Sequence, residues 1–207
     1  MSAIQKVGVI GAGQMGNGIA HVAATSALDV VLLDVTEEAL KRGLTAIDKN
    51  LTRMVQKGKL AEAEKPVILA RIKPTLHYED FGDSDLVIEA ATENESVKRK
   101  IFDQLCPVLR ADTYIASNTS SISITRLGAA TDRPARFMGM HFMNPVPVMQ
   151  LVELIRGIAT AEETFSTVRE MVLKLGKRPV SAEDFPAFIV NRILLPMINE
   201  AVYTLYE

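Results

Sequence analysis

Several features that would direct the chain to particular functions are scarce in its 207 residues. Cys106 is the single cysteine, which excludes an internal disulfide and a cysteine-rich metal site, and we expect it to be a small apolar residue in a helix. The formal net charge of −2 gives no electrostatic argument for binding nucleic acid or an anionic membrane surface. No apolar run reaches the ~18 residues of a membrane span. The first predicted strand begins so close to Met1 that a secretory or transit peptide has no room, so we expect a cytoplasmic protein.

Residues 6–34 carry the most informative motif. The apolar run Lys6–Ile10 is typical of a buried parallel strand, and a glycine-rich turn and a predicted helix follow it directly. In such a turn the first glycine permits the tight bend, the second lets the backbone approach a pyrophosphate, and the third allows close packing of helix on strand. The helix N-terminus favours the phosphate charge. The pattern predicts a dinucleotide site formed by Gly11, Gly13, Gln14, Met15 and Gly16.

An acidic residue completes this motif. The second apolar run, Val30–Leu33, ends at Asp34, near the spacing expected for the acid that binds the adenosine ribose hydroxyls. A carboxylate would repel a 2′-phosphate, and no arginine directly follows Asp34, so the sequence favours NAD over NADP.

The rest of the chain alternates predicted strands and helices. This alternation predicts an α/β fold with a doubly wound, mainly parallel sheet of the Rossmann type. Ligands in such sheets bind beyond the carboxyl ends of the strands, so four loops are expected to converge on one crevice: residues 11–16, 92–94, 117–121 and 141–147. The predicted strands are 85–91, 114–116, 136–141, 151–155 and 178–181, and the predicted helices include 96–109 and 162–175, the latter opened by a capping box at Thr160–Glu163.

Two helical segments exceed what such a fold needs. Helical periodicity over about residues 37–70 predicts a hairpin insertion, and on these residues alone a solvated hairpin is favoured over an arm that faces substrate. Pro186–Tyr206 is predicted to be one long helix, with a kink at Pro196. It is apolar nearly all round and therefore needs partners. We prefer the interpretation that the natural protein continues beyond this segment over the alternative that another subunit covers it.

Three polar positions in apolar surroundings are candidates for chemistry. A lone histidine such as His141 is usually a satisfied core residue, but it lies at the carboxyl end of its strand. Antiparallel pairing across residues 144–150 would bring Glu153 beside it. A carboxylate on one imidazole nitrogen leaves the other nitrogen for proton transfer, which a hydride-transfer enzyme acting on an alcohol requires. Asn191, a buried amide in the last helix, is predicted to bond a ligand or the loop Ser117–Ser121, where turn chemistry accounts for some of the hydroxyl groups.

Five stretches together resemble the L-3-hydroxyacyl-CoA dehydrogenase family, especially the bacterial 3-hydroxybutyryl-CoA dehydrogenases: GAGQMGNGIA, DLVIEAATEN, SNTSSISIT, HFMNPVPVMQLVEL and FIVNRILLPMINEA. The resemblance covers essentially the whole chain. It implies NAD-dependent interconversion of a short-chain L-3-hydroxyacyl-CoA and a 3-ketoacyl-CoA, a step used in fatty-acid degradation and butyrate metabolism. The implied catalytic residues are His141, Glu153, Ser120 and Asn191. The implied cofactor contacts are Asp34, Glu93, Lys98, Ser120 and Asn144, and Asn50 and Lys57 match the coenzyme A contacts, which favours a substrate-facing arm.

The resemblance also implies a domain organisation. Residues 1–185 form an NAD-binding Rossmann domain, and residues 186–207 are the first helix of a truncated C-terminal substrate and dimerisation domain of about another hundred residues. A homodimer is implied for the full-length protein, which would be a stand-alone enzyme without a fused hydratase. Two alternatives remain open: a dehydrogenase of a free hydroxy acid or sugar acid on the same fold, and a non-catalytic NAD-binding protein.

Overall fold

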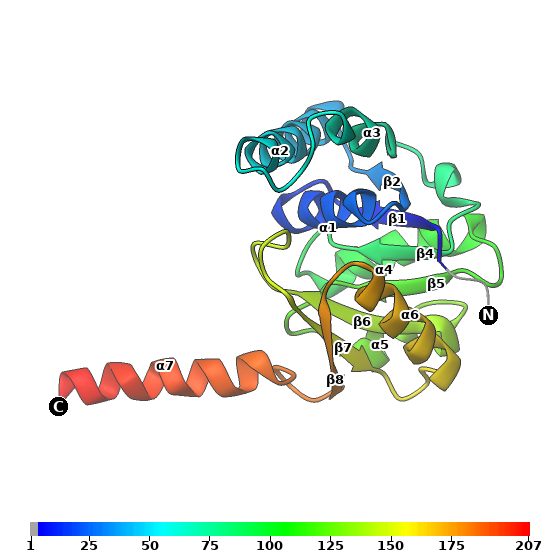
Figure 1. Ribbon diagram of the computed structural model, residues 1–207. Coiled ribbons are helices and arrows are strands. Elements are labelled where there is room, and N and C mark those ends of the chain that lie inside the picture. The colour runs from blue at the N-terminus through cyan, green and yellow to red at the C-terminus, as the bar shows by residue number, and fades with distance from the viewer. Residues whose placement is uncertain (1–3) are drawn as a thin grey trace.

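The computed structural model describes residues 4–207, so the first three residues of the predicted NAD-binding domain lie outside the described part. Within it the strands form one eight-stranded sheet with helices on both faces (Figure 1). The strands are β1 Lys6–Ile10, β2 Asp29–Leu33, β3 Ile72–Thr75, β4 Leu86–Glu89, β5 Tyr114–Ser117, β6 Phe137–Phe142, β7 Leu151–Arg156 and β8 Arg178–Glu183. The helices are α1 Gln14–Thr25, α2 Glu37–Gln56, α3 Glu64–Ala70, α4 Glu95–Leu105, α5 Ile124–Gly128, α6 Glu162–Lys174 and α7 Val190–Tyr206, with short 3₁₀ turns η1 Tyr78–Phe81, η2 Cys106–Val108 and η3 Pro134–Arg136.

The strand order β3-β2-β1-β4-β5-β6-β7-β8 confirms the predicted doubly wound Rossmann sheet. All neighbours pair in parallel except β6 and β7, which are antiparallel. The carboxyl ends of β1, β2, β4, β5 and β6 therefore meet at one edge, and β7 starts from the same edge. This is the edge at which the four predicted loops lie.

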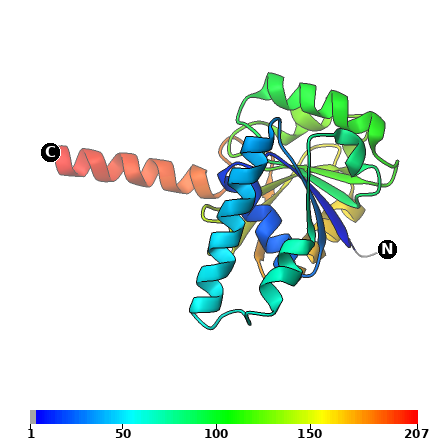
Figure 2. The same cartoon turned by 90° about the horizontal axis from the view of Figure 1, so that it is seen from above.

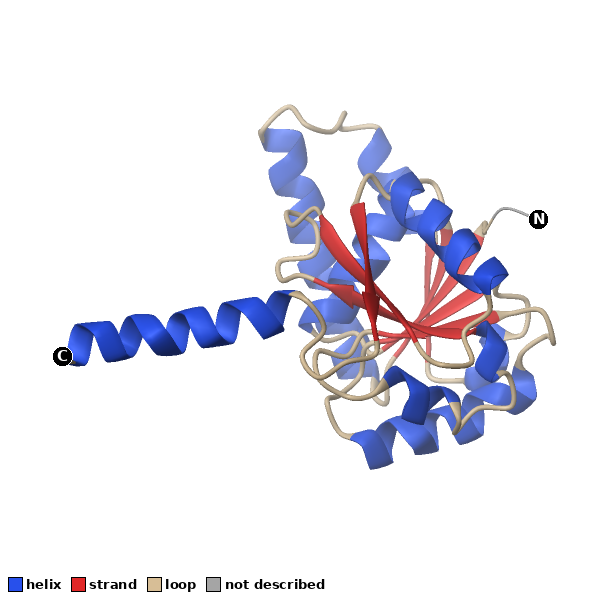
Figure 3. Ribbon diagram, turned by 90° about the horizontal axis from the view of Figure 1, so that it is seen from below, coloured by secondary structure: helices blue, strands red, loops and turns tan. Residues whose placement is uncertain are grey.

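Two apolar layers cover the sheet because successive strand residues point to opposite faces. Apolar side chains of α1, α2, α3 and α6 pack on one face, and those of η1, α4 and α5 pack on the other. Figure 2 shows α1 and α2 on one side of the strands and α4 on the other, and Figure 3 shows the strands between helices. None of the helices in this described part combines the length and apolar character that a membrane span requires.

Helices α2 and α3 form the predicted helical hairpin. Thr36 caps α2 by accepting a hydrogen bond from the amide of Ala39. Gly43 lets α2 approach the glycine-rich turn, since a Cβ atom there would lie 2.7 Å from the carbonyl oxygen of Ala12. Lys65 and Asp48 join the two helices of the hairpin by an ion pair at 2.8 Å.

The last helix begins later than predicted. Ala187 and Phe188 have φ angles of 70° and 51°, and the amide of Phe188 bonds the carbonyl oxygen of Phe185, so residues 185–189 form a turn before α7 begins at Val190. From there α7 leaves the body of the protein (Figures 1 and 3) and continues past Pro196 without a break. Its exposed apolar side chains are Ile193, Leu194, Leu195, Met197, Ile198, Val202, Tyr203, Leu205 and Tyr206.

The predicted capping box of α6 is wrong. The N-cap residue is Ala161, which has no side chain able to cap. The hydroxyl of Thr160 instead donates to the carbonyl oxygen of Phe137 at 2.7 Å and accepts from the amide of Gly157, because it lies against the start of β6. Gly176, with φ of 70°, follows the helix end as predicted.

Candidate active site

The glycine-rich turn has the close approaches that a dinucleotide cradle requires. Gly11 has φ of 99°, and a Cβ atom there would lie 2.8 Å from the carbonyl oxygen of Ala90. A Cβ atom on Gly16 would lie 1.7 Å from the carbonyl oxygen of Gly11, so α1 packs against the turn at this point. Gly13 has open space where its Cβ atom would be, and it leaves α1 without a side-chain cap. The backbone is thus accessible where a pyrophosphate would approach.

Asp34 holds this turn from the end of β2. Its Oδ2 accepts from the amide of Ala12 and its Oδ1 from the amide of Val35, both at 2.7 Å. Each carboxylate oxygen still has capacity for a ribose hydroxyl. A cavity of about 560 Å³ adjoins the turn and is lined by Gly11, Gly13 and Asp34 among others. The chemistry and shape of these residues fit an adenine dinucleotide.

His141 and Glu153 face each other across β6 and β7, as predicted. They are register partners on the same sheet face, and Nδ1 of His141 lies 2.7 Å from Oε2 of Glu153. On the other side of the ring, Nε2 lies 2.9 Å from Oγ of Ser120. Both members of the pair are buried, with exposed fractions of 6% for His141 and 0% for Glu153. Ser120, His141 and Glu153 therefore form a continuous hydrogen-bonded chain.

The second oxygen of Glu153 is occupied by the start of α7. Its Oε1 accepts hydrogen bonds from the amides of Ile189 and Val190, both at 2.9 Å. Burial alone would raise the pKa of Glu153, but the hydrogen bonds from His141 and these amides hold it below its usual value. The ring of Phe188 meets the His141 ring edge to face, with centroids 6.0 Å apart. Glu153 is thus held as a carboxylate.

Glu93 orders the loop that carries Ser120. Its Oε1 accepts from the hydroxyl of Thr119 at 2.6 Å, the amide of Ser120 at 2.8 Å, and the amide and hydroxyl of Ser121. Partial desolvation would raise the pKa of Glu93, but these hydrogen bonds and the charge of Lys98 lower it. A direct contact between Glu93 and a cofactor stays a prediction.

Hydrogen bonds from the first turns of α7 and α1 reach the loops after β5 and β6. The amide nitrogen of Asn191 donates to the carbonyl oxygen of Ser120 at 3.4 Å, which confirms the predicted bond to this loop, although Asn191 is half-buried and not fully buried as expected. Gln14 donates to Oδ1 of Asn144 at 3.1 Å, so the glycine-rich turn meets the loop after β6. Met15, behind Gln14, packs partly on the core.

Lys98 lies below the crevice in a buried cluster. It is fully buried, as is Glu89, and its Nζ lies 2.5 Å from Oε2 of Glu89 and 3.2 Å from Oγ of Ser117. Ser117 also donates to Glu89 at 2.7 Å, and the amide of Ala91 donates to the other oxygen. The cluster joins the ends of β4 and β5 to α4. In this arrangement Lys98 has no exposed surface, and its contact with a cofactor stays a prediction.

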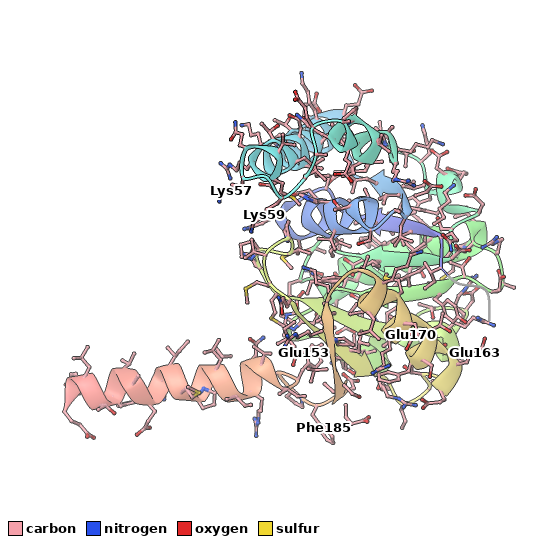
Figure 4. The ribbon with its side chains drawn as sticks, viewed as in Figure 1. Lys57, Lys59, Glu153, Glu163, Glu170 and Phe185 are labelled. Carbon is pink, nitrogen blue, oxygen red and sulfur yellow. The ribbon has the colours of Figure 1, made fainter. Side chains whose placement is uncertain are left out.

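Asn50 and Lys57 are not part of this cluster. Both lie on the helical arm, where Asn50 is half-buried and Lys57 is exposed. Figure 4 shows Lys57 and Lys59 at the end of the arm, apart from Glu153.

Sequence reasoning missed Glu89, Phe188 and Asp184. Glu89, a charged residue at the end of the apolar run Leu86–Ile88, was a signal available in the sequence. Phe188 and Asp184 gave no such signal, because the ring contact of Phe188 with His141 and the hydrogen bonds of Asp184 to the start of α5 join segments far apart in the sequence. Within residues 4–207 no group of three or more histidine, cysteine or acidic side chains is placed to hold a metal ion.

Comparisons with known proteins show what the chain as a whole is similar to. Residues 6–185 match the family model described as 3-hydroxyacyl-CoA dehydrogenase, NAD binding domain. A 3-hydroxybutyryl-CoA dehydrogenase of Bradyrhizobium diazoefficiens is 64% identical over 204 residues, which are 99% of this chain and 70% of that protein. A probable 3-hydroxybutyryl-CoA dehydrogenase of Bacillus subtilis is 49% identical over 207 residues, or 99% of this chain and 71% of that protein. The crystal structure of (S)-3-hydroxybutyryl-CoA dehydrogenase from Ralstonia eutropha superposes on this chain with a TM-score of 0.94 at 51% identity. The match covers 96% of this chain and 70% of the Ralstonia chain.

Proposed function

The chain belongs to the 3-hydroxyacyl-CoA dehydrogenase family, and we propose that it interconverts L-3-hydroxybutyryl-CoA and acetoacetyl-CoA with NAD as the hydride carrier. The observation that carries this proposal is the position of His141 between Glu153 and Ser120. This chain of hydrogen bonds lies at the same sheet edge as the glycine-rich turn and Asp34. A proton-transfer group and a cradle for a nicotinamide cofactor thus share one edge, as oxidation of an alcohol requires.

The partners of His141 define its tautomer. An ionised Glu153 can only accept hydrogen bonds, so Nδ1 of His141 carries the proton and donates to it. Nε2 is then an acceptor, and the hydroxyl of Ser120 donates to it. A substrate hydroxyl that replaces the Ser120 hydroxyl at Nε2 meets a base oriented to take its proton.

In the oxidation, the proton of the C3 hydroxyl moves to Nε2 of His141 while the C3–O bond becomes a carbonyl. NAD, when bound, accepts the hydride that leaves C3. Glu153 stabilises the imidazolium through Nδ1, and Ser120 and Asn191 hold the substrate oxygen. In the reduction, the imidazolium returns its proton to the oxygen of the ketone.

We assign cofactor binding to the turn and the loops around it. Backbone amides of Gly13, Gln14, Met15 and Gly16 would hold the pyrophosphate at the start of α1, and Asp34 the adenosine ribose. Asn144, exposed and bonded to Gln14, would approach the nicotinamide end together with Ser120. Gly11 supports the turn, Glu93 is assigned to the wall of the same crevice, and Lys98 is assigned to the buried cluster beneath it.

Coenzyme A binding is assigned to the arm. The support is the exposed ammonium of Lys57 at its end and the amide of Asn50 one to two turns before it on the same helix. Phosphate groups of coenzyme A would be attracted by such a cation.

We further propose that residues up to 185 form the NAD-binding domain and that residues 186–207 begin a helical segment that binds substrate and a second subunit. The support is the row of apolar side chains that α7 exposes beyond the body of the protein, which would be covered in a homodimer. The cytoplasmic location stays a prediction.

The test is oxidation of NADH by the 207-residue chain with acetoacetyl-CoA, with free acetoacetate as the matched control substrate. Turnover with the thioester and little with the free acid is expected. Turnover with acetoacetate alone would overturn coenzyme A recognition and favour a dehydrogenase of free hydroxy acids. Bound NADH without any turnover would favour a non-catalytic NAD-binding protein.

A further inference from the structure

Asp184 ties the segment before α7 to the region that follows the catalytic loop. This residue comes directly after β8, and its Oδ2 accepts hydrogen bonds from the hydroxyl of Ser123 at 2.6 Å and the amide of Thr125 at 2.8 Å. Its Oδ1 accepts from the amide of Ile124 at 2.9 Å. Burial would raise the pKa of Asp184, but these hydrogen bonds lower it, so the group is an anion held by three donors. The linker, residues 184–189, is therefore fixed at its first residue.

The middle of the linker has a conformation that needs such support. Ala187 and Phe188 both have φ in the left-handed region, which is unfavourable for residues with a side chain and persists where surrounding contacts hold it. The hydrogen bond from the amide of Phe188 to Phe185 closes the turn. The Phe188 side chain is 6% exposed and its ring contacts that of His141.

The far end of the linker reaches the acid–base pair. The amides of Ile189 and Val190 donate to Oε1 of Glu153, both at 2.9 Å. Only a few residues thus separate the anchor on α5 from the amides on the carboxylate that orients His141. A displacement of the linker would remove both hydrogen bonds at once.

We propose that Asp184 is a positioning residue for the acid–base pair: by holding the linker on α5, it keeps the amides of Ile189 and Val190 on Glu153. This inference rests on the proposed function, in which Glu153 is ionised beside His141. The two amides stabilise the carboxylate against protonation. When they are lost, Glu153 takes up a proton at a higher pH, and activity at acidic pH falls.

The surroundings of Glu153 make this effect specific. Among residues 4–207 His141 is the one titratable side chain that hydrogen-bonds or forms an ion pair with Glu153. Strand β8 presents Val180 opposite it, and α7 presents backbone amides. No second charge is therefore available to replace the two amides.

The test compares Asp184→Asn with Asp85→Asn. Asp85 is a matched control because it also accepts hydrogen bonds from two backbone amides, those of Gln5 and Lys6, at the edge of the sheet opposite the active site. We expect D184N to raise the midpoint of the acid limb of the kcat profile by about half a pH unit or more, while KM for NADH changes little. D85N should lower stability and leave the acid limb in place. Equal loss of activity by D184N at every pH would overturn the proposal and indicate a merely structural role.

A second measurement does not depend on turnover. The amide proton shifts of Ile189 and Val190, followed by NMR across acidic pH, report protonation of the carboxylate they bond. In D184N their titration should move to higher pH or disappear, and in the milder variant Ser123→Ala, which removes one of the three donors to Asp184, it should move less. Titration unchanged in both variants would overturn the proposal. Lack of turnover by the unmodified chain would overturn the proposed function and leave this readout intact.

Discussion

The antiparallel register of β6 on β7 places His141 directly opposite Glu153, with Nδ1 and Oε2 2.7 Å apart. This buried pair is bonded to Ser120 and is not part of the glycine-rich turn or of Asp34. Its contribution to turnover can therefore be measured separately from cofactor binding. We expect His141→Gln to lower kcat by about 10²-fold or more, the scale of general acid–base catalysis, with the Kd for NADH little changed. Glu153→Gln should act in the same direction. Glu163→Gln, an exposed acid on α6, is the control, and normal turnover by H141Q would rule out the role.

Asp34 should set the choice between NAD and NADP. In Asp34→Asn the charge that repels a 2′-phosphate is gone, and the side-chain amide opposes one of the two backbone amides that Asp34 now accepts. We expect NADH affinity to fall about 10-fold or more, as for loss of a hydrogen bond to a charged group. NADPH affinity should fall less, so the preference for NADH over NADPH becomes smaller. Fluorescence titration with each cofactor measures the two affinities. Asp29→Asn, at the other end of β2, should leave both affinities unchanged, and an unaltered preference in D34N would contradict the assignment.

The buried pair of Lys98 and Glu89 should be essential for stability. Lys98→Met leaves the Glu89 carboxylate buried without its cation, which is expected to lower the free energy of unfolding by about 3–5 kcal/mol. The double variant K98M/E89Q should lose less than the sum of the single changes, because the unpaired charge is absent. Urea unfolding provides the values. Lys73→Met, which breaks an exposed pair with Asp80, should cost about 1 kcal/mol or less. Equal effects of K98M and K73M would show that the buried pair has no special role.

Much of the fold and the central pair could be predicted because the signals are local. The glycine turn, Asp34 and the alternation of strands and helices are written in short stretches. Antiparallel pairing across the short connection 144–150 brings Glu153 beside His141. Asn191 was a candidate as an amide within an apolar helix, and family resemblance added Ser120. Ser120 contacts the His141 ring, and Asn191 contacts the backbone of Ser120.

What could not be predicted depends on contacts between distant segments. The helix expected from Pro186 starts at Val190 because Phe188 packs against His141 and the backbone turns to reach Glu153. Thr160 fits a capping box by spacing, yet the first residue of β6 offers its hydroxyl a different partner. Propensity is a weak guide wherever such a tertiary bond competes with a local one.

His21 should make the protein less stable in mild acid. It is 2% exposed, and its Nδ1 has no hydrogen-bond partner in residues 4–207. Burial, and then the charge of Lys177, lower its pKa from 6.5 to about 4. The unfolded chain therefore binds more protons than the native one between these values. Stability is complete above about pH 6.5 and falls as the pH decreases towards 4.

Replacing His21 by Leu removes this titration while filling an apolar site. When the pH is lowered from 7.5 to 5, the titration of His21 should cost the unmodified chain up to about 2 kcal/mol of unfolding free energy that H21L keeps. Each pH unit below 6.5 is worth at most about 1.4 kcal/mol. Urea unfolding at pH 7.5 and pH 5 gives the change in unfolding free energy for each protein. Comparing this change between H21L and the unmodified chain cancels any effect of the substitution on packing. His77→Gln, at an exposed position, should show the same dependence of unfolding free energy on pH as the unmodified chain. The same dependence in H21L as well would mean that His21 is not held neutral in the native state.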